Sequence, residues 1–173
     1  MNRRKAVAVV LSVAPLASAK KKTSPLREKF VGVWKLISVE FRDKVTGEVS
    51  YPYGANPVGR ITYDTAGRMS AQLMNRGRRA VGGSPTRSAA AAIREASPQD
   101  MRDILTGFAS YFGTFDIDES SRTVVHHVQA HLIPSWVGTE LRRTYEFSSG
   151  NQLILTAVTD QGTSRLVWQR DGA

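Results

Sequence analysis

The sequence contains no cysteine, although it is 173 residues long. Without thiols the chain can form neither a disulfide framework nor a thiolate metal site. It also has no apolar run long enough to cross a bilayer as a helix, because the longest one, residues 6–16, is broken by Ser12 and Pro15. Hydrophobic residues make up 41% of the chain, which together with its length predicts one globular domain with a single core.

Familiar cofactor and catalytic motifs are missing as well. The basic, glycine-rich stretch at residues 75–85 has neither the Walker nor the dinucleotide glycine spacing, so it does not predict a phosphate cradle. No G-x-S-x-G motif accompanies the histidines. His127 and His131 are four residues apart on a predicted strand, which is too far for both to bind one metal ion. We therefore predict no cofactor and no metal site.

The N-terminus has the pattern of a secretory signal peptide. Residues 3–5 are a basic head, residues 6–16 are the apolar run, and three small residues at 17–19 end it. We predict cleavage near Ala19 and export to the periplasm or the medium, with a basic linker at residues 20–29. An alanine-rich N-terminal helix is the alternative interpretation.

The net charge of +9 is concentrated at the N-terminus. Six lysines and arginines lie at residues 3–5 and 20–22, so about +3 remains on the rest of the chain, and a nucleic-acid interface needs its charges clustered on the fold. We predict no nucleic-acid partner, and no stable membrane span once the signal peptide is removed.

Short strands separated by turns dominate the rest of the chain. Residues 58–74 give the clearest hairpin, because two stretches rich in β-forming residues flank a turn at Gly67. Turn signals return at residues 43–47, 118–122, 148–151 and 160–162, each about a strand length apart. A long antiparallel sheet without crossover helices removes its edges by closing. We predict an all-β, up-and-down antiparallel β-barrel of about eight or nine strands.

Two helical segments interrupt this pattern. Residues 26–30 predict a short turn of helix that caps one end of the barrel. A longer insertion begins near Ser88, and its second part has Ser97 as an N-cap, a proline at the first helical position and Asp100 in the first turn. Apolar residues at 101, 104, 105 and 108 form one stripe, which predicts that this helix packs against the barrel.

Eight segments in this order resemble the bacterial and fungal lipocalin-like domain family. They are VGVWKLIS (31–38), YPYG (51–54), PVGRITY (57–63), GRMSAQL (67–73), YFGTF (111–115), TVVHH (123–127), PSWVG (134–138) and LVWQR (166–170). The resemblance implies a lipocalin-like barrel domain over residues 30–170 with an internal cavity for an apolar or amphipathic molecule. It also implies that Arg170 stacks on Trp34 and closes one barrel end, a structural role. Some similar barrels are isomerases or cyclases.

Candidate ligand-binding residues come from the strand faces. On the strand at 140–147, Arg143 and Tyr145 share a face, and an inward arginine beside a tyrosine can hold a carboxylate; an arginine that only reaches the rim is the alternative. His127 is the inward histidine that we favour as a general base or ligand contact, and a neutral, packed histidine is the alternative. The other candidates are Tyr63, Gln72 and Trp136, because they interrupt or cap apolar strand faces.

These observations support a ranked set of hypotheses. The first is an exported lipocalin-like protein that binds a small hydrophobic or amphipathic ligand, including acidic ones, inside the barrel. The second is an isomerase or cyclase that uses His127 or Tyr145 for proton transfer in the cavity. The third is a barrel with a filled core that binds another protein or has a structural role.

Overall fold

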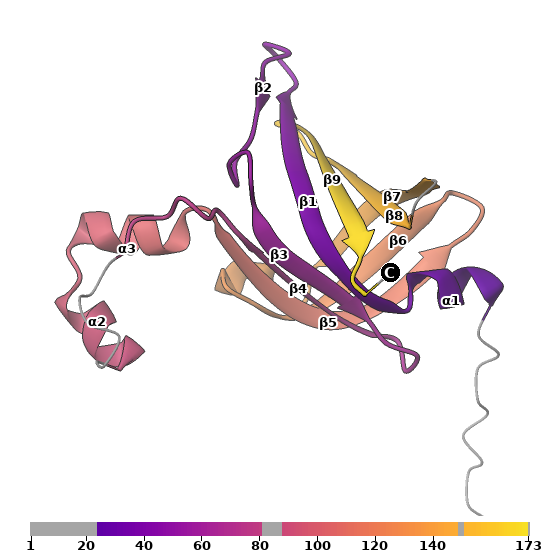
Figure 1. The fold of residues 1–173 in the computed structure, drawn as a ribbon, viewed down its shortest axis with the longest axis horizontal. Coiled ribbons are helices and arrows are strands. Elements are labelled where there is room, and N and C mark those ends of the chain that lie inside the picture. Colours follow the sequence, from indigo (N-terminus) through magenta and orange to yellow (C-terminus); the bar gives the residue numbers. More distant parts are fainter. Residues whose placement is uncertain (1–23, 81–87, 149–150, 173) are drawn as a thin grey trace, which may run out of the picture.

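A computed structural model describes residues 24–80, 88–148 and 151–172, and over these residues the chain forms a closed antiparallel barrel with a few short helices (Figure 1). The predicted signal peptide lies outside the described residues, as do the first residues of the predicted linker and residues 81–87 of the glycine-rich stretch. None of the helices in the described part is both long and apolar enough to cross a membrane.

The barrel wall consists of eight strands, and each pairs in antiparallel fashion with the next along the chain. Strand β1 pairs with β3 on one side and with β9 on the other, which closes the barrel, while the short β2 extends the far end of β1. The predicted fold class is therefore confirmed. The strands are β1 (Gly32–Asp43), β2 (Val49–Ser50), β3 (Val58–Tyr63), β4 (Arg68–Met74), β5 (Phe108–Asp118), β6 (Thr123–His131), β7 (Glu140–Ser148), β8 (Gln152–Val158) and β9 (Gly162–Arg170).

Two register shifts decide which side chains face the interior. On β1, Leu36 pairs with Trp168 and Ser38 pairs with Val167, so Ile37 is an extra residue that points outward. On β6, Val128 pairs with Gly113 and Ala130 pairs with Phe112, which leaves Gln129 as the extra residue. Each bulge reverses the alternation of the strand beyond it.

Helix α1 (Pro25–Phe30) closes one end of the barrel. Its N-cap is Ser24, whose side chain accepts a hydrogen bond from the Arg27 N–H at 3.2 Å. Phe30 ends the helix, is fully buried, and meets three rings edge-on with centroids 5.0–5.4 Å away, those of Tyr63, Tyr145 and Phe147. The predicted helical turn is present, and its last residue is an aromatic plug.

The end of β9 is fastened to the same end of the barrel. The guanidinium of Arg170 lies 4.1 Å from the ring centroid of Trp34 and donates to the carbonyls of Val31 at 2.9 Å and Lys29 at 2.6 Å. Gly32 makes room for it: its φ is +134°, and a Cβ there would lie 2.6 Å from Arg170 Nη1. This is the stacking that the resemblance implied for Trp34 and Arg170.

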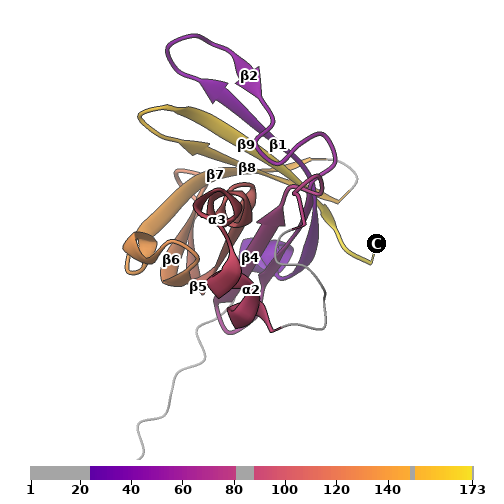
Figure 2. The same cartoon turned by 90° about the vertical axis from the view of Figure 1, so that its left-hand side faces the viewer.

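The helical insertion lies at the opposite end. Helices α2 (Ala89–Glu95) and α3 (Pro98–Leu105) join β4 to β5 and project away from the barrel (Figures 1 and 2). The sequence signals at the start of α3 are confirmed, because Ser97 and Asp100 form a reciprocal capping box. The packing prediction is wrong: no residue of α3 is buried, and Leu105 remains 42% exposed.

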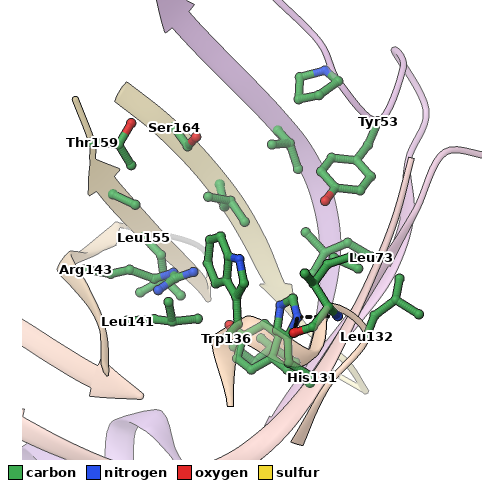
Figure 3. A pocket seen from close by; sticks show the side chains of 18 of the residues that line it. Tyr53, Leu73, His131, Leu132, Trp136, Leu141, Arg143, Leu155, Thr159 and Ser164 are labelled. Atoms are coloured by element: carbon green, nitrogen blue, oxygen red, sulfur yellow. Dashed lines mark hydrogen bonds between the residues drawn. The ribbon is translucent and has the colours of Figure 1, made fainter. Parts of the chain in front are cut away.

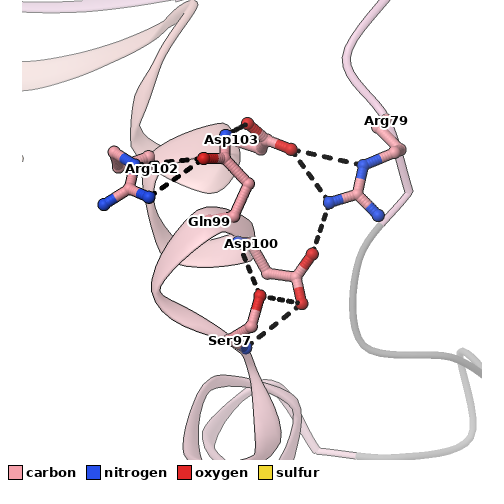
Figure 4. Close-up of polar contacts among 6 residues, drawn as sticks. All are labelled: Arg79, Ser97, Gln99, Asp100, Arg102 and Asp103. Carbon is pink, nitrogen blue, oxygen red and sulfur yellow. Dashed lines mark hydrogen bonds and ion pairs between the residues drawn. The ribbon is translucent and has the colours of Figure 1, made fainter.

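Ion pairs connect the basic stretch after β4 to α3. The Arg79 guanidinium contacts the carboxylates of Asp100 and Asp103, the latter at 2.9 Å (Figure 4). Arg78 donates to the carbonyl of Ile104, and its guanidinium lies 5.2 Å from the Phe108 ring centroid. These arginines therefore hold the insertion in place beside the end of β4.

Candidate functional site

The interior of the barrel contains a cavity of about 660 Å³. Most of its wall is aliphatic or aromatic, with side chains from strands on all sides, including Val39, Ile61, Leu73, Tyr111, Leu155, Leu166 and Trp168. Four other lining residues mark the mouth: Tyr53 before β3, Leu105 at the end of α3, Trp136 in the 3-10 turn η1 (Pro134–Trp136) and Val158 at the end of β8. The mouth is thus at the end of the barrel away from α1.

Arg143 brings a positive charge into this apolar space. It lies on the inward face of β7, and its guanidinium reaches from the strand toward the middle of the cavity (Figure 3). Among the described residues it has no hydrogen-bonded or ion-paired partner. Its neighbour Arg142 points outward and pairs with Glu140 at 2.7 Å. An unpaired guanidinium in an apolar wall is suited to an anionic ligand group.

A buried histidine links two tyrosines. His126 is completely buried; its Nε2 lies 2.8 Å from the hydroxyl of Tyr63, and its Nδ1 lies 3.1 Å from the hydroxyl of Tyr111. Tyr63 is part of the core, whereas Tyr111 also lines the cavity. The chain of hydrogen bonds therefore runs from the core beside Phe30 to the cavity wall.

Burial controls the protonation of these groups. It lowers the pKa of His126 well below its ordinary value, and Coulomb interactions with Arg143 and His127 lower that pKa further. Burial also raises the pKa of Tyr63 and of Tyr111, an effect that Arg143 opposes in both cases. At neutral pH the histidine is uncharged and both tyrosines keep their protons.

Aromatic rings stack along one side of the mouth. His131 lies between Tyr111, with ring centroids 5.6 Å apart, and Trp136, with centroids 5.1 Å apart and planes 15° apart. The Ile133 N–H donates to His131 Nδ1 at 2.8 Å, which holds the ring against the segment leading into η1. Tyr53 lines the cavity as well, so one of the two tyrosines of the segment at 51–57 belongs to the ligand mouth.

Trp168 has a buried donor without a hydrogen-bond partner among the described residues. Its side chain is 1% exposed and lines the cavity, and its indole Nε1–H is buried without a hydrogen-bond partner in the described part of the chain. Buried donors are normally paired, and an unpaired one costs about 1–3 kcal/mol.

The six predicted ligand-binding residues have different locations. Arg143 and Trp136 line the cavity, and their side chains extend into it (Figure 3). Tyr63 lies in the core behind the cavity wall, bonded to His126. Tyr145 shares the inward face of Arg143 as expected, but it packs on Phe30 in the plug.

The remaining two, Gln72 and His127, lie on the outer face of the barrel. Gln72 is exposed on β4. His127 lies between the carboxylates of Asp116 at 3.2 Å and Glu140 at 3.4 Å, so the inward histidine is His126. The residues missed by sequence reasoning are Tyr111, His126, His131 and Trp168. Three of these, Tyr111, His126 and Trp168, belong to segments that carry the family resemblance, which was the available signal for them.

The chain is similar to several solved structures and to one family of domains. Three solved structures align over most of the chain: a redesigned β-barrel (12% identity, 83% of this chain and 93% of that one, TM-score 0.40), a de novo designed fluorescence-activating β-barrel (11%, 83% and 95%, 0.39) and a mutant of the fluorescent protein UnaG (12%, 84% and 99%, 0.37). No curated protein matches the sequence significantly. The family model of the lipocalin-like domain matches residues 31–171. The chain therefore belongs to the lipocalin-like domain family.

Proposed function

We propose that this protein is an exported carrier or sequestering protein that binds one small amphipathic acid inside its barrel. The fold supports binding of a small ligand, and the unpaired guanidinium of Arg143 is the observation that carries the proposal. The apolar part of the ligand occupies the aliphatic and aromatic wall, and its acidic group lies at Arg143.

The size and composition of the cavity are consistent with this function. A volume of about 660 Å³ lies within the range of about 300–1,000 Å³ that small-molecule sites occupy. Such sites combine a mainly apolar wall with a few polar groups that orient the ligand. Here the apolar wall comes from strands on all sides, while the charge comes from β7 alone. The ligand therefore has one charged end and a hydrophobic body.

Export is supported by the N-terminal sequence pattern. The basic head, the apolar run and the small residues before Lys20 are typical of a cleaved signal peptide. A carrier in an envelope compartment or in the medium would bind hydrophobic acids outside the cytoplasm. Mass determination of the protein recovered from the periplasm and the medium tests this part, and an intact N-terminus in the cytoplasmic fraction alone would contradict it.

Ligand binding is tested first by native mass spectrometry of the purified protein, followed by denaturing extraction of whatever co-purifies. A stoichiometric small acid is the expected result. Calorimetry with alkyl and aromatic carboxylates then measures affinity in the unsubstituted protein and in Arg143→Gln. Loss of a hydrogen-bonded charge pair predicts affinity about ten- to a hundredfold weaker for the variant.

Arg165 offers the matched control. It lies on β9, is exposed on the outer face and does not line the cavity. Arg165→Gln removes the same charge from the protein, so its carboxylate affinity should stay within about twofold of the original. Equal losses in both variants would indicate a general electrostatic effect, and no binding of any probe would exclude the carrier function.

An isomerase or cyclase is the second candidate, and one observation favours it. The Tyr111–His126–Tyr63 chain connects the cavity wall to a buried imidazole, which is an arrangement that can pass a proton. The same extraction experiment separates the two functions. An enzyme would release a product chemically different from the added acid, and Tyr111→Phe would abolish that conversion.

A further inference from the structure

We propose that Tyr111 is fixed as a hydrogen-bond donor toward the cavity, so that together with Arg143 it selects a ligand whose polar end only accepts hydrogen bonds, namely a carboxylate. This inference rests on the proposed function and specifies the chemistry of its ligand. It follows from counting hydrogens along the buried Tyr63–His126–Tyr111 chain.

The count begins at Tyr63. Its side chain is 1% exposed, and among the described residues its hydroxyl has one hydrogen-bond partner, Nε2 of His126 at 2.8 Å. A buried O–H without an acceptor costs free energy, so the hydroxyl donates to Nε2. The neutral imidazole has one N–H and one bare nitrogen. Nε2 is therefore the bare nitrogen, and Nδ1 carries the proton.

The second step concerns Tyr111. Because Nδ1 carries the proton, it donates to the Tyr111 oxygen at 3.1 Å. The oxygen of Tyr111 thus acts as an acceptor toward His126, and its own O–H has no acceptor among the described residues. Tyr111 is 7% exposed and lines the cavity, so the free O–H can find an acceptor only there. The tyrosine therefore offers its O–H to a ligand, while one of its two lone pairs is used by His126.

The neighbouring polar groups favour the same ligand. Arg143 has only N–H donors and lines the cavity. Of the oxygens at the mouth, Glu140 pairs with Arg142 and the Thr159 hydroxyl donates to the Gly162 carbonyl, while the hydroxyls of Tyr53 and Ser164 can donate as well as accept. A carboxylate satisfies these donors. An amine would bring further donors and a like charge to Arg143, and a primary amide would bring two N–H groups.

This polarity predicts a specific order of affinities. Among probes with the same alkyl chain, the carboxylate should bind best, and the primary amide and the amine should bind at least about tenfold more weakly, because Arg143 and the Tyr111 O–H offer no acceptor to their N–H groups. Tyr111→Phe should weaken carboxylate binding by about tenfold and leave amine binding unchanged within about twofold. Tyr51→Phe is the matched control, because Tyr51 is exposed and does not line the cavity.

A measurement on the unsubstituted protein tests the hydrogen count directly. Long-range ¹H–¹⁵N NMR of the imidazoles distinguishes the two neutral tautomers, and the chain has only three histidines to assign. The expected result is Nδ1–H with bare Nε2 for His126 in the absence of ligand. Nε2–H with bare Nδ1 would overturn the inference, because Tyr111 would then donate to His126 and present lone pairs to the cavity.

The outcomes separate this inference from the proposed function. If Arg143→Gln weakens carboxylate binding but Tyr111→Phe does not, the carrier function stands and the donor role of Tyr111 is wrong. If the amide binds as tightly as the carboxylate, the polarity argument is wrong even though a ligand binds. If no probe binds while NMR finds Nδ1–H, the hydrogen count stands and the carrier function fails.

Discussion

The two ends of the barrel differ in how completely their side chains are packed and paired. At the end closed by α1, Phe30 is fully buried among aromatic rings, and Arg170 is stacked on Trp34 and bonded to two carbonyls. At the mouth, large apolar side chains remain in contact with solvent: Trp136 is 45% exposed and Val158 is 76% exposed. The closed end is therefore packed like a protein core, whereas the mouth leaves large apolar side chains exposed.

The two ends therefore have different roles: the closed end stabilises the fold, and the mouth gives access to the cavity. The aromatic plug joins α1 to strands on several sides of the barrel, so the free energy of unfolding depends strongly on it. Helix α3 buries none of its residues, so the mouth can change shape without disturbing the plug. Between the two ends, Arg143 and the Tyr111–His126 pair hold polar groups in fixed positions on rigid strands. Four substitutions or conditions test this division.

The largest effect is expected for Phe30→Ala. Removing a fully buried phenylalanine from the centre of the plug should lower the free energy of unfolding by about 3–5 kcal/mol, because the contacts are lost and a cavity remains. Urea denaturation measures it. Phe112→Ala is the control: Phe112 is 53% exposed on the outer face of β5, so its loss should cost about 0.5 kcal/mol or less. Similar costs at both positions would contradict the proposed division.

Arg170→Met should have the next largest effect on stability. The variant keeps an unbranched side chain but loses the stacking on Trp34 and the hydrogen bonds to Val31 and Lys29, so we expect a loss of about 2 kcal/mol. Arg165→Met on the outer face of the same strand should change the free energy of unfolding by less than about 0.5 kcal/mol. Equal midpoints in denaturant for the two variants would show that the stack contributes nothing.

Acid should destabilise the protein through His126. Burial holds its pKa in the folded state below the unfolded value of about 6.5, so the unfolded chain binds the extra proton first as the pH falls. The free energy of unfolding should therefore decrease below about pH 6.5, by at most about 1.4 kcal/mol per pH unit for this one group.

Urea titrations between pH 7 and pH 5, together with a variant, check this effect. His126→Gln should flatten the profile in this range, whereas His127→Gln on the outer face should retain it. The aspartates contribute in a separate range, because the pKa of Asp118 is lowered to about 2 by hydrogen bonds from Ser120 and Ser121. A profile that stays flat in the unsubstituted protein would show that His126 can be protonated within the fold.

The smallest effect on stability is expected for Trp136→Ala. This residue is half exposed at the mouth, so the free energy of unfolding should change by about 0.5 kcal/mol or less. Its ring stacks on His131 and extends into the cavity (Figure 3), so its removal should speed ligand dissociation by about tenfold. Stopped-flow displacement of a bound carboxylate measures the rate. A destabilised variant with an unchanged rate would place Trp136 in the core and not in the mouth.

Much of the fold was accessible from sequence because turns and capping residues act locally. The hairpin at 58–74 forms with Tyr63 opposite Met69, as the position of Gly67 indicated. The capping box at Ser97 and Asp100 also depends on a few neighbouring residues. The prediction that α3 packs against the barrel failed because packing, unlike capping, does not depend on neighbouring residues alone. An apolar stripe shows that a helix can be covered, but the distance between helix and barrel depends on the whole insertion.

The residues of the site were harder to predict from the sequence, because bulges change the side-chain alternation. Strict alternation along β6 places His127 and His131 on one face, yet the extra residue Gln129 separates them. His131 consequently shares the interior with His126, and His127 lies outside. The burial of His126 also depends on hydroxyls from β3 and β5, which no local pattern on β6 reveals. Arg143 was predictable because β7 keeps regular alternation throughout.

The hydrogen bond from Arg170 to the Lys29 carbonyl holds the two ends of the barrel domain together. It therefore also determines where the domain can be joined to a surface or to another protein. Helix α1 and the end of β9 leave the barrel side by side at its closed end (Figure 1), and the Asp171 N–H donates to the Val33 carbonyl there. A surface tether, an affinity tag or a fused domain joined at either terminus of the barrel therefore departs from the side opposite the mouth. Immobilisation through either terminus leaves ligand entry unobstructed.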